Sequence, residues 1–215
     1  MIYYLPGCDF AKNHPEASRI MTEYLLKKGM KIAQCCQNET DYFSEGDTLI
    51  TNCTQCSIIM KERIPYVRQL SLYEYLLTDE EFIWPDYASE TMTVQDCRRT
   101  AEYKEMQEAV RECLRRMNIS FIETEENKEN STFCGVWLNN PANPVCVKAA
   151  PETFRKLEQY REILSPEEQK KKMIEHVRSY STEKVIVYCN GCEKGLKLGG
   201  GHPVHLMELL AGRSS

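Results

Sequence analysis

Apolar and polar residues alternate along the first 60 positions in a pattern that predicts short strands and amphipathic helices in turn. Apolar runs at residues 2–5, 31–33 and 47–51 predict strands. Residues 15–28 carry Ile20, Met21, Tyr24 and Leu25 at helical spacing, which predicts a helix. Strands that alternate with helices are typical of a parallel sheet.

The second half of the chain repeats this plan. Strands are predicted at residues 92–95, 120–124 and 185–188, and a helix at residues 101–117, where Met106, Val110 and Leu114 form one stripe. The segment DTLITNCTQCSIIM (47–60) aligns with EKVIVYCNGCEKGL (183–196) at an offset of 136, and both cysteines of each segment match. The segments at 67–77 and 204–212 are both predicted to be short apolar helices. The sequence therefore predicts an internal duplication.

The duplication divides the chain into two half-domains. We expect a first repeat at residues 1–80 and a second at residues 90–215, with a connection inside residues 78–91. The second repeat contains a helical insertion at about residues 140–183, which begins with the proline-rich NNPANP. The predicted fold class is α/β, with two pseudo-repeated half-domains of short parallel strands and flanking helices.

Composition narrows the function. The chain has 215 residues and a formal net charge of −5, which argues against nucleic acid as a partner. No segment approaches the ~20 consecutive apolar residues of a membrane span, and the N-terminus lacks the pattern of a secretion signal. We therefore expect a cytoplasmic protein without a membrane span.

Eleven cysteines are the main chemical signal. In a reducing compartment they are more plausible as metal ligands or redox groups than as disulfides. Nine of them fall where a predicted strand ends and a helix begins, and such positions meet at one edge of a parallel sheet. These nine are Cys8, Cys35, Cys36, Cys53, Cys56, Cys97, Cys134, Cys189 and Cys192.

The adjacent pair Cys35-Cys36 constrains the kind of centre. Consecutive side chains on an extended backbone point to opposite faces, so both thiols reach one small ion only if the backbone bends there. Zinc takes four thiolates in a closed tetrahedron, which would leave a fifth cysteine of the first half unused. An iron–sulfur cluster contains several irons and accepts ligands from diverging positions.

The order of cysteine, CC or CG, and C-x-x-C occurs twice and resembles the cysteine-rich CCG domain. This domain occurs in heterodisulfide reductases of the B type and in their relatives among lactate, glycolate and succinate oxidoreductases. The second copy carries the closest resemblance, in DCRRTAEYKEMQEAVRECLRR and in ETEENKENSTFCG. At the level of motif order the resemblance covers nearly the whole chain.

The resemblance implies an iron–sulfur oxidoreductase that cleaves a disulfide between two clusters. It assigns Cys8, Cys35, Cys36, Cys53 and Cys56 to a noncubane 4Fe-4S cluster, with Cys35 and Cys36 in the catalytic role. The chain has no nucleotide-binding motif, so electrons would come from a partner protein that carries iron–sulfur clusters or flavin.

The sequence also departs from the family pattern. Gln37 stands where the family has glycine, and only 16 residues separate Cys36 from Cys53. In the second copy Phe133 replaces the first cysteine of the pair, which leaves Cys97, Cys134, Cys189 and Cys192. Four thiolates predict a conventional 4Fe-4S cluster or a zinc ion at the second site.

Two other functions remain open at this point. The chain could be an electron-relay protein that binds no substrate, or a zinc or thiol redox switch. Cys113 and Cys146 lie outside the motifs and are interpreted as structural residues. His202 and His205 are interpreted as surface residues at a helix start rather than as ligands.

Overall fold

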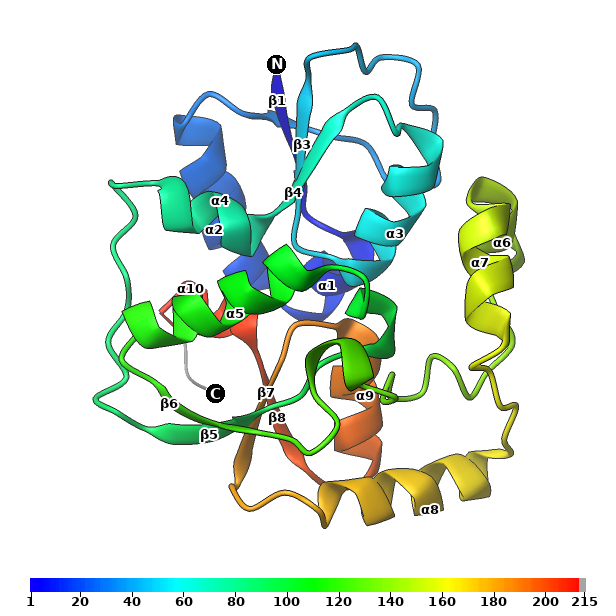
Figure 1. Cartoon of the computed structure of the whole chain (residues 1–215). Helices are drawn as coiled ribbons and strands as arrows, with labels where there is room; N and C mark the ends of the chain where they lie inside the picture. The colour runs from blue at the N-terminus through cyan, green and yellow to red at the C-terminus, as the bar shows by residue number, and fades with distance from the viewer. Residues whose placement is uncertain (213–215) are drawn as a thin grey trace. The chain divides into compact units, whose positions relative to one another are not determined.

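Two four-stranded sheets, each with all strands parallel, organise this computed structural model, which describes residues 1–212. The first sheet has the order β2-β1-β3-β4 and the second the order β6-β5-β7-β8 (Figure 1). In both sheets the first strand in sequence is internal and the second lies at an edge. The prediction of an α/β fold with two similar half-domains of parallel strands and flanking helices is confirmed.

The contacts group the chain into two units. Unit 1 contains Met1–Glu80 together with Ala142–Gln159, and unit 2 contains Glu81–Pro141 together with the chain from Tyr160 onward. Its position in the chain predicts that the whole insertion at about residues 140–183 belongs to the second repeat. The structure instead groups residues 142–159 with unit 1, because chain position does not decide which surface a helix packs against.

The strands and helices of unit 1 alternate along residues 1–80. Their bounds are β1 Ile2–Leu5, α1 Cys8–Asn13, α2 Pro15–Lys27, β2 Lys31–Ile32, β3 Thr48–Thr51, α3 Thr54–Arg63, β4 Arg68–Ser71 and α4 Leu72–Thr78. The helices α6 Pro144–Ala149 and α7 Pro151–Glu158 complete the unit. Leu49 and Ile50 of β3 are fully buried, so this strand forms part of the hydrophobic core.

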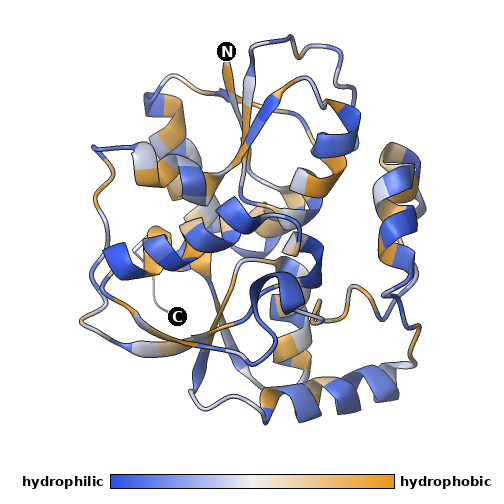
Figure 2. Ribbon diagram, viewed as in Figure 1, coloured by the Kyte–Doolittle hydropathy of each residue, from blue (hydrophilic) through white to orange (hydrophobic). Residues whose placement is uncertain are grey.

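Unit 2 repeats the order of elements seen in residues 1–80, with one α-helix inserted between its second and third strands. Its elements are β5 Thr91–Val94, the 3₁₀ turn η1 Arg98–Thr100, α5 Lys104–Arg116, β6 Ser120–Glu123, the 3₁₀ turn η2 Lys128–Asn130, α8 Pro166–Val177, β7 Lys184–Val187, α9 Asn190–Leu198, β8 His202–His205 and α10 Leu206–Leu210. Figure 2 shows α8 as mainly hydrophilic, in keeping with its run of lysines. Its buried residues are Gln169 and Met173.

Two edge strands differ from the sequence prediction. Residues 67–77 and 204–212 were expected to be helical throughout, but β4 pairs with β3 and β8 pairs with β7 before α4 and α10 begin. Neither RQLS nor HPVH has an alternating strand pattern, so pairing with the neighbouring strand decides their conformation. His205 lies at the start of a helix as expected, where its Nδ1 accepts a hydrogen bond from the Met207 N–H, but it is only 1% exposed, so its expected surface position was wrong.

A buried ion pair lies directly before the cysteines of unit 2. Arg111 on α5 is 1% exposed and donates two hydrogen bonds, of 2.7 and 2.5 Å, to Asp96, whose side chain is fully buried. Glu123 and the Tyr188 hydroxyl also contact this pair. Burial opposes the charge of Asp96, but the hydrogen bonds and charge of Arg111 hold its pKa below the usual value. The network fixes the backbone that leads into Cys97.

No helix within residues 1–212 combines the length and the apolar character that crossing a membrane requires.

Candidate metal centres

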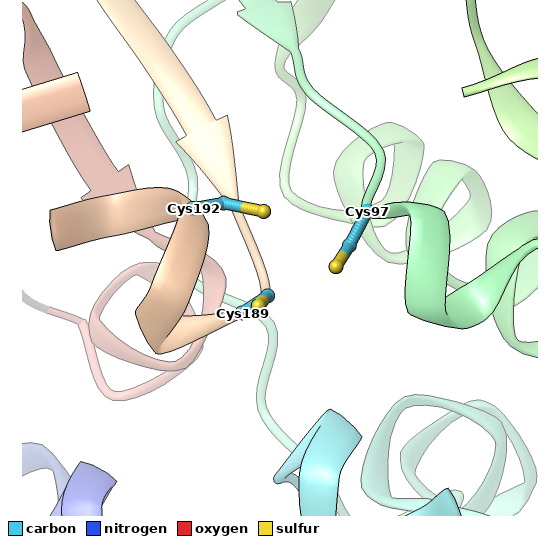
Figure 3. A group of neighbouring side chains, drawn as sticks. All are labelled: Cys97, Cys189 and Cys192. Carbon is cyan, nitrogen blue, oxygen red and sulfur yellow. The ribbon is translucent and has the colours of Figure 1, made fainter. Parts of the chain in front are cut away.

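Four buried cysteines converge in unit 2. Cys97 follows β5, Cys189 precedes the first residue of α9, and Cys192 lies in the first turn of that helix (Figure 3). Their three Sγ atoms all lie within 4.8 Å of one another. The Sγ atom of Cys134 lies 3.4 Å from that of Cys97. The structure thus gathers the four thiols that the sequence assigned to the second site.

Glycines allow the loop of Cys134 to approach α9. Gly135 has φ +53°, and a Cβ placed there would lie 1.9 Å from the carbonyl oxygen of Gly191 and 2.8 Å from Cα of Cys192. A Cβ on Gly195 would lie 2.5 Å from Cα of Gly135. Because Gly135 packs against Gly191 and Gly195 with no side chain between the backbones, Cys134 can reach the C-x-x-C pair. This contact gives a physical reason for the glycine in the sequence FCG.

Arg99 places a buried positive charge beside the four thiols. Its side chain lies over the ring of Trp137 at 4.3 Å, and its Nη2 donates a 3.0 Å hydrogen bond to Sγ of Cys189. The residue is only 5% exposed. An arginine stays protonated in proteins, so its charge stabilises thiolates and would offset the negative charge of a thiolate-bound metal. Arg99 was not among the site residues expected from the sequence, although the basic pair after Cys97 was a possible signal.

The four thiols differ in acidity. Hydrogen bonds from the other three cysteines, assisted by the charge of Arg99, lower the pKa of Cys189 well below that of a free thiol. Burial raises the pKa of Cys97 and of Cys192. The thiolate form is therefore favoured at Cys189, beside Arg99, and a metal cation would favour deprotonation of the other thiols.

The five cysteines of unit 1 lie in equivalent places. Cys8 begins α1, Cys53 precedes the first residue of α3 and Cys56 lies in its first turn. Cys35 and Cys36 follow β2 in a turn in which the Asn38 N–H binds the Cys35 carbonyl at 2.8 Å. The backbone therefore bends at the CC pair.

Contacts between thiols also link these five residues, but the arrangement is more open than that of the four thiols in unit 2. A hydrogen bond from Cys56 lowers the pKa of Cys36, and burial together with Cys35 raises the pKa of Cys8. Within residues 1–212, no three Sγ atoms of this set lie mutually within 4.8 Å. Cys36 and Cys56 are buried, whereas Cys8 is exposed. The set is wider than the group in unit 2 and opens toward solvent at Cys8.

Arg63 fixes the turn that presents the CC pair. Its Nη1 donates 2.7 Å hydrogen bonds to the carbonyl oxygens of Cys36 and Asn38. Arg63 also contributes a positive charge that lowers the pKa of Cys36, in addition to the larger effect of Cys56. The hydrogen bonds that hold this turn and the positive charge beside it therefore both come from the helix that carries Cys56.

A cavity of about 410 Å³ in unit 2 is bordered by residues that closely precede Cys97 and Cys134 in the sequence. Its lining includes Gln95, Phe133, His176 and Tyr180. Gln95 Oε1 accepts a 2.5 Å hydrogen bond from the Tyr180 hydroxyl and lies 2.9 Å from Nε2 of His176. Phe133 stacks on the His176 ring, with 4.0 Å between the ring centres. Phe133 occupies the position of the first cysteine of the CCG pattern, and here its side chain lines this cavity.

His176 makes the stability of unit 2 depend on pH. Burial lowers its pKa from 6.5 to about 4, so the folded state keeps the ring neutral while the unfolded state takes up a proton. The contribution of the neutral His176 ring to the free energy of unfolding is fully present above pH 6.5. It is lost as the pH drops toward 4, by at most about 3 kcal/mol. In denaturant titrations from pH 7 to 4.5 at fixed metal content, H176Q is expected to lose less stability than the parent protein. Equal pH slopes for both proteins would contradict this assignment.

Comparison with protein-family models gave no match, and comparison with curated proteins gave none either. The fold and the sites define a cysteine-rich α/β protein of two similar units. One unit contains a buried group of thiols that could hold a metal ion or cluster.

Proposed function

We propose that the chain is an iron–sulfur oxidoreductase component of the heterodisulfide reductase B type. It would reduce a disulfide or a related acceptor with electrons from a partner redox protein that carries iron–sulfur clusters or flavin. The observation that carries this proposal is the gathering of Cys97, Cys134, Cys189 and Cys192 around the buried charge of Arg99. A second, wider set of five cysteines at the equivalent edge of the first sheet supports it.

The residues fit the chemistry of such a centre. Thiolates are the protein ligands of iron–sulfur clusters, and hydrogen bonds and nearby positive charge tune the potential of a cluster. Cys8, Cys35, Cys36, Cys53 and Cys56 would hold the first cluster, a noncubane 4Fe-4S cluster, and the four cysteines of unit 2 the second centre. A bound cluster would supply one-electron transfer. The exposed Cys8 marks the side of the first site that a substrate would approach, and Cys35 and Cys36 are the proposed catalytic residues.

Zinc is a second candidate for the centre of unit 2. Four ligands at the usual zinc–sulfur bond length of ~2.3 Å place sulfur atoms roughly 3.8 Å apart. The observed 3.4 Å between the Sγ atoms of Cys97 and Cys134 is close to that spacing, and the 4.8 Å limit among Cys97, Cys189 and Cys192 is compatible with it. If unit 2 held zinc, which has no redox chemistry, the proposed disulfide reduction would take place at the five-cysteine site of unit 1.

Metal and sulfide analysis of anaerobically purified protein tests the proposal. We expect about eight irons per chain, or about four irons and one zinc, with acid-labile sulfide equal to iron and an EPR signal after reduction. At most one iron per chain would overturn the iron–sulfur function and leave the zinc or thiol-switch alternative.

A reoxidation experiment separates catalysis from electron relay. Reduced protein is mixed with small disulfides, and the return of the oxidised cluster spectrum is followed. The parent protein and a C113A control are expected to reoxidise, whereas C36A is expected not to, because Cys36 belongs to the proposed catalytic pair. If no disulfide reoxidises the parent protein, the chain acts as a relay.

A further inference from the structure

The insertion is fixed to the helix that carries the first C-x-x-C motif. Helices α6 and α7 belong to unit 1 although they follow the Cys134 loop in sequence. Glu62 on α3 accepts hydrogen bonds from the backbone N–H groups of Glu152, at 3.0 Å, and Thr153, at 2.7 Å. These N–H groups lie at the start of α7, where a carboxylate satisfies donors that the helix itself leaves open. Because α6 ends at Ala149, directly before α7, these hydrogen bonds also hold α6 close to α3.

Helix α6 brings Cys146 against both cysteine motifs of unit 1. The Cys146 side chain is fully buried, and its Sγ accepts hydrogen bonds from Nε2 of Gln55, at 3.0 Å, and from Nε2 of Gln37, at 3.2 Å. Gln55 lies inside the C-x-x-C motif, and Gln37 directly follows the CC pair. Burial raises the pKa of Cys146, and the nearby thiols of Cys36 and Cys35 add to that effect. A sixth sulfur thus contacts a residue of each cysteine motif and lies near enough to Cys35 and Cys36 to interact with their charges.

The duplication shows what is different about unit 1. Gln55 aligns with Gly191 at the offset of 136, and Gln37 stands in the place of Gly135 in its own motif. In unit 2 the two glycines touch directly, and a Cβ on Gly191 would lie 3.2 Å from Nη2 of Arg99. Unit 2 therefore places a cation beside its C-x-x-C motif, whereas unit 1 has two glutamine amides that converge on a cysteine at the equivalent place.

We propose that Cys146 is a sixth sulfur ligand of the first metal site, supplied by the insertion. The inference rests on the proposed function, in which the other five cysteines of unit 1 hold a metal cluster. Two amide N–H donors on one sulfur stabilise a thiolate and orient it, as partners of metal ligands commonly do. Cys146 is fully buried, so it would be a ligand shielded from solvent, in contrast to the exposed Cys8.

The test compares C146S with C113S under anaerobic conditions. Serine at position 146 keeps the size and the hydrogen-bond acceptor for Gln37 and Gln55 but removes the sulfur. Cys113 is also fully buried, but lies on α5 in unit 2, outside both cysteine sets. Each purified protein is analysed for iron and is then stripped and titrated with Co²⁺ alone, whose thiolate charge-transfer absorption reports sulfur ligands.

We expect C146S to lose iron from the first site to a chelator at least about tenfold faster than C113S. Its charge-transfer absorption per bound Co²⁺ is expected to be lower as well. If C146S and C113S retain iron equally and give the same Co²⁺ spectrum, Cys146 is a packing residue and the inference is overturned. If the parent protein binds neither iron nor Co²⁺, the proposed function itself fails, and with it this inference.

Discussion

Replacing Gly135 with alanine is expected to separate Cys134 from the other thiols of unit 2 and to abolish metal binding there. The new Cβ would lie 1.9 Å from the carbonyl oxygen of Gly191, so the loop or α9 must move. The positive φ adds about 1 kcal/mol of strain. We expect G135A to lower the free energy of unfolding by at least about 3 kcal/mol. Denaturant titration and metal analysis of the same preparation measure both effects.

Gly200 provides a matched control for this prediction. It has φ +80° in the same unit, but a Cβ there would meet nothing within 4 Å. G200A therefore carries the cost of the backbone conformation without the collision and is expected to lose only about 1 kcal/mol. If G135A and G200A have the same stability and metal content, close packing of the two backbones does not position Cys134.

Replacing Arg111 with methionine is expected to destabilise unit 2 by about 3–5 kcal/mol. The change leaves the carboxylate of Asp96 fully buried without its cation, and removing one partner of a buried pair costs far more than removing both. The double variant D96N/R111M is therefore expected to recover part of the loss. Chemical denaturation of the three proteins measures these differences.

Arg115 offers a matched control on the same helix. Its side chain is 56% exposed and pairs with Glu112, so R115M is expected to change the free energy of unfolding by less than about 1 kcal/mol. Acid should weaken the same ion pair in the parent protein from the other side, because it protonates Asp96 and leaves Arg111 without its carboxylate partner. Because Arg111 holds the pKa of Asp96 below 3.8, the stabilisation is complete above that pH and is lost as the pH falls further. Equal losses for R111M and R115M would show that the buried pair contributes little.

The sequence pattern predicted the buried strands that recur in both units, and it missed the edge strands β4 and β8, which form by pairing with a neighbouring strand. The apolar runs at 2–5, 47–51 and 185–188 form central strands because burial on both faces selects such residues. The edge strand β8 lacks that pattern and forms through its pairing with β7. Cysteine spacing predicted which thiols of unit 2 meet, since strand ends and helix starts share one edge of a parallel sheet.

Side chains that act through burial were harder to predict. Arg99 and Arg111 occur in charged stretches, where arginine is usually exposed, and only the packed structure shows that both are buried. Cys146 stood outside every motif, and its place beside Gln37 and Gln55 depends on how the insertion packs. Local spacing carries no information about such a long-range contact.

The division of unit 1 into two separate stretches of chain has a consequence during synthesis. Residues 1–80 emerge from the ribosome first, whereas α6 and α7 follow only after β5, α5 and β6 of the other unit. Domains generally fold as their chain emerges, N-terminal parts first. Residues 1–80 therefore remain an incomplete unit, with the surface of α3 uncovered, until residues 142–159 have also been translated.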